Sequence, residues 1–266
     1  MSTATPESAP LTQTAIEQEY DAIHLAFENI KLKHRADLGA KDVEHITSMR
    51  RYSRIFEVIG RSLICVLPGP LALIGVPFLF LHRNIEAIEI GHNVLHGQYD
   101  SFESIPQFHS RKFRWKAPVD EISWRQEHNG VHHVHTNVYE KDPDLNHGFL
   151  RVNDQVPHTR LHYFQLPIYL FLFYPIMLYN FNAQNLGAVD KFRERNFPLG
   201  NKGYAVLDDN LRLSDADVKK RHRRAVWRIW AKEYVFFPLL SLVAGFGFFK
   251  VFLANLLADV LNNYWI

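Results

Sequence analysis

The chain has 266 residues, and 30 Lys and Arg stand against 28 Asp and Glu, so a net charge of +2 gives no reason to expect nucleic acid as a partner. Its single cysteine, Cys65, excludes an internal disulfide framework and any cysteine-rich zinc or iron–sulfur site. Aromatic residues make up 14% of the chain, and 11 of the 15 histidines lie between His82 and His162. These two features carry most of the information in the sequence.

Residues 1–50 are polar and begin with a Ser/Thr/Pro-rich stretch, and the first apolar run comes too late for a secretory signal. We therefore expect 1–50 to be a polar cytosolic tail that is partly disordered at its start. Residues 51–266 are expected to form a membrane domain, for the reasons given next.

The first apolar run, Ser62–Leu81, has 20 consecutive residues without a charge, enough for a helix of ~30 Å, which is one hydrocarbon thickness. The cluster Pro68-Gly69-Pro70 falls inside this run, and such a cluster breaks a helix. We expect a tight hairpin between a helix that ends near Leu67 and a second helix from Leu71 to about Gly91. A single broken span is the alternative.

Two further apolar runs follow, Leu161–Phe181 and Tyr234–Phe249, and the second resumes after Lys250. Repeated runs of this length predict an all-α, multi-pass transmembrane protein and argue against a soluble protein with buried core helices. The linker 182–233 holds 12 Lys and Arg against 7 Asp and Glu, with KKRHRR at 219–224, which favours the cytoplasmic side. The number of crossings is left open.

The segment EIGHNVLHGQYD, residues 89–100, carries the first histidine pair. His92 and His96 are four residues apart, so on a helix they share one face and can share a metal ion. Gly97 then provides a helix stop. Glu89, three residues before His92, is placed to orient a ligand imidazole. This motif alone is weak evidence for a metal.

The segment WRQEHNGVHHVHTN, residues 124–137, repeats the spacing at His128 and His132. On an α-helix His133 would turn about 100° away, toward a second neighbouring centre. Imidazole ligands without cysteine are typical of iron, zinc, copper or nickel. The two motifs together predict a metal site, and five histidines exceed the four ligands of a structural zinc site, so two metal ions are expected.

The remaining histidines have no clear spacing partner, and we expect them to be interfacial or solvated: His82, His109, His147, His158, His162 and His222. Trp115, Trp124 and the pair Trp227 and Trp230 are expected in an interfacial aromatic belt.

Both histidine motifs, together with EYVFFPLL (233–240) and LANLLADVLNNYWI (253–266), resemble the membrane fatty acid desaturases, the histidine-box di-iron family, and most of all the bacterial acyl-CoA and acyl-lipid type. The resemblance runs from roughly residue 45 to the end. It implies a helical membrane fold with a cytoplasmic, histidine-rich cap, two iron ions as cofactor, and O₂-dependent insertion of a cis double bond into a saturated acyl chain. The iron ligands that it implies are His92, His96, His128, His132 and His133.

The resemblance also implies partners: an acyl-CoA or acyl-lipid substrate, membrane lipid, and a separate electron donor of the ferredoxin, rubredoxin or cytochrome b5 type. His135 lies beyond the second box and is not among the implied ligands. Asp142 and Asp144 fall in a stretch like the family's acidic one, where they either support the site or are solvated loop acids.

The family's third histidine box, of the form H-x-x-H-H, does not occur in this sequence. We therefore expect the chain to be truncated at Ile266, and the 266-residue product to be incompletely metallated and inactive. Two alternatives remain. One is a hydroxylase or alkane monooxygenase of the same superfamily. The other, less favoured because the histidines lie in polar sequence beyond the helix ends, is a metal transporter or sensor without enzymatic activity.

Overall fold

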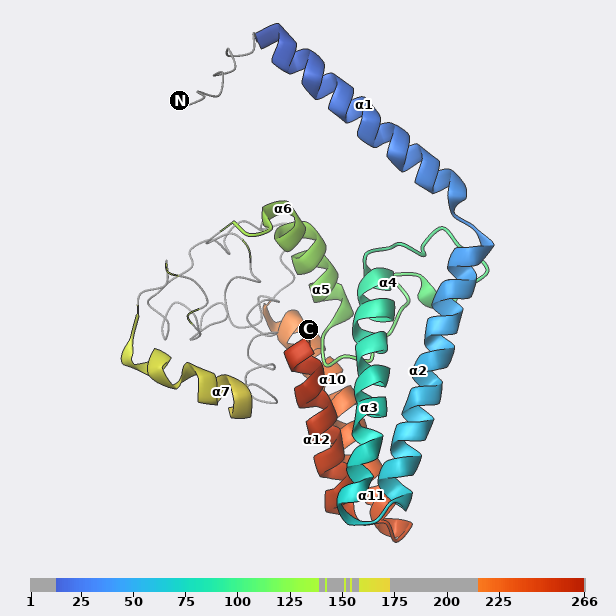
Figure 1. Ribbon diagram of the computed structural model, residues 1–266, viewed down its shortest axis with the longest axis vertical. Coiled ribbons are helices and arrows are strands. Elements are labelled where there is room, and N and C mark those ends of the chain that lie inside the picture. Colours follow the sequence, from blue (N-terminus) through green and yellow to red (C-terminus); the bar gives the residue numbers. More distant parts are fainter. Residues whose placement is uncertain are drawn as a thin grey trace, which may run out of the picture. The chain divides into compact units, whose positions relative to one another are not determined.

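A computed structural model describes residues 13–138, 142, 151, 154, 158–172 and 215–265. Every regular element in these ranges is a helix, which confirms the all-α prediction for the described part of the chain (Figure 1). Contacts divide the chain into two units, Met1–His45 and Ile46–Ile266, and each is described by itself. The first unit consists mainly of α1 (Gln13–Asp37), a single helix within the predicted tail.

The second unit begins with a helical hairpin. Its first arm belongs to α2 (Ala40–Val66). Its second arm is a continuous run of η1 (Gly69–Gly75), α3 (Val76–Asn84), η2 (Ile85–His92) and α4 (Asn93–Leu95). The break falls at Leu67 and Pro68, and Gly69 has a φ of +51°, a backbone conformation that favours glycine. The predicted hairpin is confirmed, and its second arm is one turn longer than expected.

The two arms of this hairpin touch backbone to backbone. A Cβ atom placed on Gly75 would lie 2.5 Å from the carbonyl oxygen of Gly60 and 2.7 Å from Cγ1 of Ile64. No larger side chain fits there without moving an arm. The absence of a side chain at Gly75 therefore sets the spacing of the hairpin.

A second hairpin follows near the C-terminal end of the chain. Its first arm is α10 (Asp215–Trp230), η9 (Ala231–Phe236) and α11 (Phe237–Val243), and its second arm is α12 (Phe248–Trp265). The turn uses Gly245 and Gly247, with φ of +79° and +95°. The apolar run Tyr234–Phe249 is therefore split between two helices.

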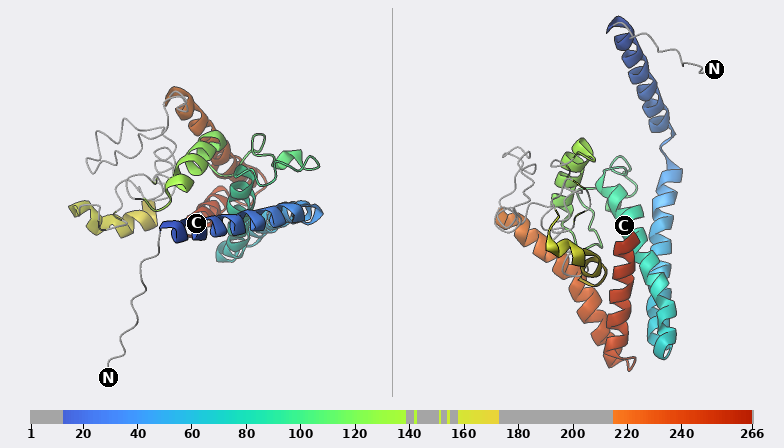
Figure 2. Two further views of the ribbon diagram at one scale, coloured as in Figure 1. Left: turned by 90° about the horizontal axis from the view of Figure 1, so that it is seen from above. Right: turned by 60° about the vertical axis from the view of Figure 1, so that its left-hand side comes forward.

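The two hairpins pack together through α3 and α12, which lie side by side (Figures 1 and 2). Their contact forms an apolar core of Ile64, Val76, Leu79, Val251, Ala254 and Ala258. Near the turns, Nζ of Lys250 donates to the carbonyl oxygens of Cys65 and Leu67, at 2.7 and 3.2 Å. A cation at the C-terminus of α2 satisfies carbonyls that have no partner within the helix.

Charged side chains also cross between the hairpins. Arg61 of α2 and Arg83 of α3 both bind the buried carboxylate of Glu233, at 2.9 and 3.2 Å, and Arg83 pairs with Asp259 of α12 at 2.7 Å. Each carboxylate here has a guanidinium partner. Removal of one partner would leave a buried charge uncompensated, which is costly.

The unit also contains η3 (Pro106–Phe108), α5 (Glu121–Glu127), η4 (His128–His132) and α6 (His133–His135). The predicted run Leu161–Phe181 is helical as far as it is described, with η6 (Arg160–Phe164) and α7 (Gln165–Leu172). Its remainder, 173–181, and most of the linker 182–233 lie outside the described residues.

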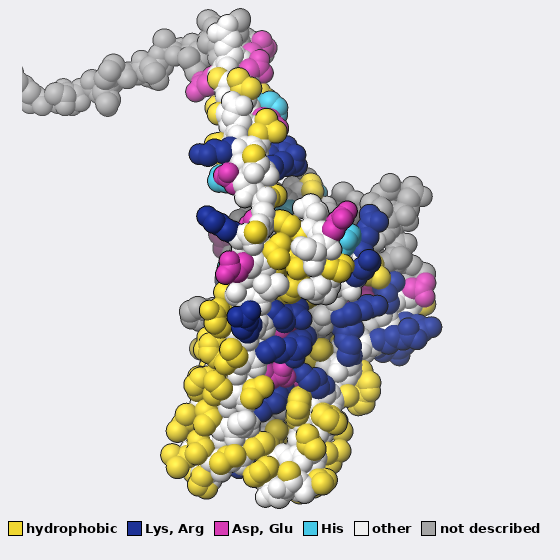
Figure 3. Space-filling view, turned by 90° about the vertical axis from the view of Figure 1, so that its right-hand side faces the viewer, with side chains coloured by type: hydrophobic (Ala, Val, Ile, Leu, Met, Phe, Trp, Pro, Cys, Tyr) yellow, Lys and Arg dark blue, Asp and Glu magenta, His cyan; other side chains and the backbone are white. Residues whose placement is uncertain are grey.

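Among the described residues, one helical segment, Gly69–Leu95, is long and apolar enough to cross a membrane. Large apolar side chains are exposed around the ends of both hairpins, among them Val66, Leu73, Leu242, Val243 and Phe249. Figure 3 shows such side chains gathered over one end of the unit, with Lys and Arg side chains above them.

Candidate metal centre

The first histidine pair lies where the second arm of the N-terminal hairpin ends. The π-helical segment η2 ends at His92, α4 adds three residues, and His96 follows. Gly97 has a φ of +79°, and its N–H donates to the carbonyl of Val94 at 2.9 Å, so the predicted helix stop is confirmed. The Nε2 atoms of His92 and His96 lie 3.0 Å apart.

The second histidine group begins in the π-helical segment η4, directly after α5. A π-helix makes about 4.4 residues per turn, or roughly 80° per residue, so residues i, i+4 and i+5 share one face. His128, His132 and His133 have this spacing. The expectation that His133 turns away from His128 is therefore wrong, because it assumed α-helical geometry: their ring centroids lie 4.7 Å apart.

The five histidines expected to bind iron form one cluster. Each ring contacts at least two others, with centroid distances from 4.6 to 5.2 Å across the cluster, which consists of His92, His96, His128, His132 and His133. His135, which was not expected among the ligands, makes no ring contact with the cluster in the described part of the chain.

The nitrogen positions fit a metal ion. The ligand atoms of His92, His96 and His128 all lie within 4.8 Å of one another, and Nε2 of His133 lies 3.4 Å from that of His96. Two nitrogens each about 2.1 Å from one ion are about 3.0 Å apart at a right angle and about 3.4 Å apart at a tetrahedral angle. The buried Nε2 of His128 has no hydrogen-bond partner among the described residues, so a ligand bond would satisfy it.

The protonation state of the cluster also suits metal binding. Burial, and then the charges of neighbouring imidazoles, lower the pKa of His128 to about 3. Burial and the charge of His133 likewise lower the pKa of His96. Both rings are therefore neutral at pH 7, and only a neutral imidazole offers its nitrogen to a metal.

Asp142 supports the second group from the loop that follows it. Its carboxylate is 1% exposed; one oxygen lies 2.8 Å from Nδ1 of His132, and the other accepts from the N–H of Asn137 at 2.7 Å. A carboxylate on Nδ1 fixes the tautomer and directs Nε2 of His132 toward the cluster. Of the two roles considered for Asp142, the supporting one is thus the one that the structure shows. Asp144 lies outside the described residues.

Two tryptophans form an aromatic wall against the cluster. Trp124 stacks on His128, with centroids 4.2 Å apart and 18° between the planes, and it meets His92 and His96 edge-on. Trp115 is buried, packs edge-on against Trp124 and donates from Nε1 to the carbonyl of Glu86 at 3.1 Å. Histidine rings and helix backbone thus surround the two indoles, and their expected place in an interfacial belt stays a prediction.

Two arginines of α10 hold the start of α5 in place. Asp120 caps α5 by accepting from the N–H of Ser123 at 3.0 Å, and Arg221 donates to the same carboxylate at 3.0 Å. Arg228 donates to Glu121 at 2.8 Å and to the carbonyl of Trp115 at 3.0 Å. Arg221 belongs to the basic segment 219–224, which the sequence predicts to lie on the cytoplasmic side. The structure adds a contact within the fold, the hydrogen bond from Arg221 to Asp120.

Three of the other histidines differ from expectation. His82, His162 and His222 are buried rather than solvated. His82 hydrogen-bonds to the hydroxyl of Ser53, and the N–H of Thr159 donates to His162, so helix contacts account for both positions. His158 and His162 also form a pair four residues apart, with ring centroids 5.4 Å apart, which sequence reasoning missed.

The role considered for Glu89 has no support among the described residues. Its side chain is exposed, and its recorded partner is the amide of Asn93, which donates to the Glu89 backbone carbonyl at 2.9 Å.

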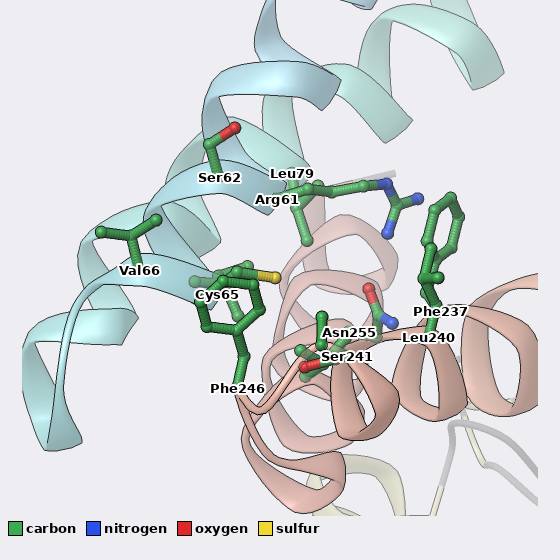
Figure 4. A pocket seen from close by; sticks show the side chains of 13 residues that line it. Arg61, Ser62, Cys65, Val66, Leu79, Phe237, Leu240, Ser241, Phe246 and Asn255 are labelled. Atoms are coloured by element: carbon green, nitrogen blue, oxygen red, sulfur yellow. The ribbon is translucent and has the colours of Figure 1, made fainter.

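Apart from the histidines, a cavity of about 360 Å³ lies between the hairpins. Its walls come from α2, α3, α11 and α12 and are mostly apolar, and Figure 4 shows Cys65, Phe246 and Leu240 among its lining side chains together with the polar Arg61 and Asn255. Its volume is typical of small-ligand pockets, which range from about 300 to 1,000 Å³.

The chain thus has an all-helical unit in which two helix ends bring five imidazole side chains together, a donor set typical of metal sites. Two curated relatives match it, each named NADPH-dependent stearoyl-CoA 9-desaturase, from Mycobacterium tuberculosis strains CDC 1551/Oshkosh and ATCC 25618/H37Rv. Each is 31% identical over 266 aligned positions that cover 97% of this chain and 56% of the relative. The chain is thus related to the fatty acid desaturases, as its histidine motifs predicted.

The chain spans about half the length of these relatives. Neither a protein-family model nor a solved structure matches it.

Proposed function

We propose that the protein to which this chain belongs is an O₂-dependent fatty acyl desaturase, which introduces a cis double bond into a saturated acyl chain. The observation that carries the proposal is the convergence of two histidine motifs, 32 or more residues apart in sequence, on one set of ring nitrogens. The relationship to stearoyl-CoA desaturases supports the same reaction.

We propose two iron ions as the cofactor, held in part by His92, His96, His128, His132 and His133. Bound there, iron would supply the activation of O₂ that removal of hydrogen from an unactivated C–H bond requires. The chain's own contribution is to lower the pKa of His96 and His128 by burial, which keeps both rings neutral, and to orient His132 through Asp142. Trp124 shields one side of the cluster from water.

We propose an integral, multi-pass membrane location with the histidines on the cytoplasmic side. The apolar segment Gly69–Leu95 and the exposed apolar side chains at the hairpin ends support membrane insertion. The basic helix α10 supports the cytoplasmic side, because Lys and Arg collect there. Arg221 and Arg228 of α10 bind Asp120 and Glu121 at the start of α5, the helix that leads into the second histidine group, and this supports a common side for both.

We propose a saturated acyl-CoA as the substrate to test first, with an acyl-lipid as the alternative. The printed names of the relatives favour the CoA ester. The cavity between the hairpins is apolar and could accept part of an alkyl chain. Electrons would come from a separate carrier protein of the ferredoxin, rubredoxin or cytochrome b5 type.

The test is expression of the whole gene product in a host that lacks acyl desaturation, with iron content and acyl products both measured. His128→Ala should lower bound iron and abolish the double bond, whereas His135→Ala, outside the cluster, should leave both intact. Hydroxylated chains in place of unsaturated ones would instead establish the hydroxylase alternative. Unchanged unsaturation in His128→Ala would refute the proposed iron site.

A further inference from the structure

The N-terminal helix α1 carries an apolar stripe that runs along its whole middle part. Large side chains recur at alternating intervals of four and three residues, and each is between 50% and 71% exposed: Ile16, Tyr20, Ile23, Phe27 and Ile30. This alternation is the pattern of the seam positions of a two-stranded coiled coil. An exposed stripe of this kind on a 25-residue helix offers a surface on which an apolar partner can pack.

The charges beside the stripe indicate which partner fits. The first half of α1 is acidic next to the seam, with Glu17 and Glu19, and the second half is basic, with Lys31 and Lys33. Two copies of α1 side by side in the same direction would place like charges at the same level. Two copies in opposite directions would bring Glu17 near Lys31 and Glu19 near Lys33 on both flanks, and opposite charges at such flanking positions select partner and orientation.

Antiparallel pairing also matches the sizes of the seam side chains. When the two copies are centred near residue 25, Ile23 of one copy faces Phe27 of the other, and Tyr20 faces Ile30. Each layer then combines one aromatic ring with one isoleucine. A parallel pair would instead oppose aromatic to aromatic and isoleucine to isoleucine, which leaves layers of unequal size along the seam.

We propose that α1 is a self-association element, through which two copies of this chain join by an antiparallel pair of α1 helices. The surface consists of the stripe of α1 and the four flanking charges. The proposal is independent of the proposed catalytic function, because it involves none of the residues of the metal centre.

The experiment is sedimentation equilibrium of the full chain in density-matched detergent. The stripe variant combines Ile23→Asp with Phe27→Asp, and the matched control combines Leu25→Asp with Leu32→Asp, which are equally exposed leucines on the opposite side of α1. We expect a dimer for the wild type and the control, and a dissociation constant raised roughly a hundredfold or more in the stripe variant. A monomeric wild type, or a control that dissociates as readily as the stripe variant, would overturn the proposal.

A charge exchange tests the orientation. Glu17→Lys with Glu19→Lys should weaken the dimer, and so should Lys31→Glu with Lys33→Glu. All four changes in one chain recreate opposite charges only between antiparallel helices, so the fourfold variant should recover wild-type association. A fourfold variant that remains as weak as either double variant would exclude the antiparallel pair.

Discussion

The chemistry of the metal centre depends on which ring nitrogens are left free to bind. Asp142 occupies Nδ1 of His132, which leaves Nε2 for a metal, and Nε2 of His128 has no hydrogen-bond partner in the described part of the chain. The spacing of the histidines made these residues predictable as ligands. The sequence left two roles open for Asp142, support of a histidine or a solvated loop acid. A loop sequence does not show whether a carboxylate is buried or solvated.

Asp142→Asn should weaken metal binding while leaving the shape of the loop almost unchanged. The amide is isosteric with the carboxylate, yet it carries no charge to fix the tautomer of His132. Loss of such a supporting carboxylate typically lowers metal affinity by about 10- to 100-fold. Titration of the purified, metal-free protein with Fe(II) would measure the change, and an unaltered affinity would show that Asp142 does not support a metal ligand.

The metal-free protein should lose stability as the pH falls, in part through His128. Burial holds the pKa of His128 at about 3, below its value in the unfolded chain, so between these two pKa values only the unfolded state takes up the proton. The contribution is fully present above the unfolded pKa and declines as the pH is lowered through this window. Melting temperatures of wild type and His128→Gln from pH 7 to pH 4 should converge, and parallel curves would contradict the assignment.

At the scale of the helices, local sequence motifs predicted where a helix ends. The packing of the helices depends on contacts between residues far apart in sequence. The cluster Pro68-Gly69-Pro70 marked the first hairpin correctly, because proline and glycine act on the local backbone. The hydrogen bonds from Arg221 and Arg228 to the start of α5 join residues about a hundred positions apart in sequence. No local pattern predicts such pairs, which is why the basic segment was interpreted only as a topology signal.

Gly75→Ala should destabilise the first hairpin. The new methyl group would collide with the backbone of Gly60, and overpacking of this kind costs about 1–3 kcal/mol. A lower melting temperature than that of the wild type would report the effect. Gly39→Ala is the matched control, since a Cβ atom there meets no other atom within 4 Å, and the prediction fails if both variants melt alike.

For the molecule as a whole, an average over the chain conceals how its polarity is distributed. Mean hydropathy is −0.18, yet apolar side chains are concentrated at the hairpin ends, with Lys and Arg side chains above them (Figure 3). The apolar runs therefore predicted the distribution better than the composition did. The described residues contain one segment long and apolar enough to span a membrane, and the turn at Gly245 and Gly247 divides the apolar run Tyr234–Phe249.

The chain should accordingly behave as an integral membrane protein. After expression it is expected to sediment with membranes and to remain there through a wash with alkaline carbonate, which removes proteins held by charge alone. Detergent should then release it. Recovery of the folded chain in the carbonate supernatant would contradict the proposed membrane insertion.

The π-helical segments also determine which changes in length the protein can accept. A π turn contains one residue more than an α turn, so deletion of Gly130 from η4 would allow ordinary α-helical hydrogen bonding and would look harmless by helix propensity. After the deletion His132 and His133 would follow His128 at three and four residues, which on an α-helix places them about 60° and 40° from it, near the roughly 40° on either side that the π turn gives. The π turn thus absorbs one extra residue and keeps three histidines of uneven spacing on one face.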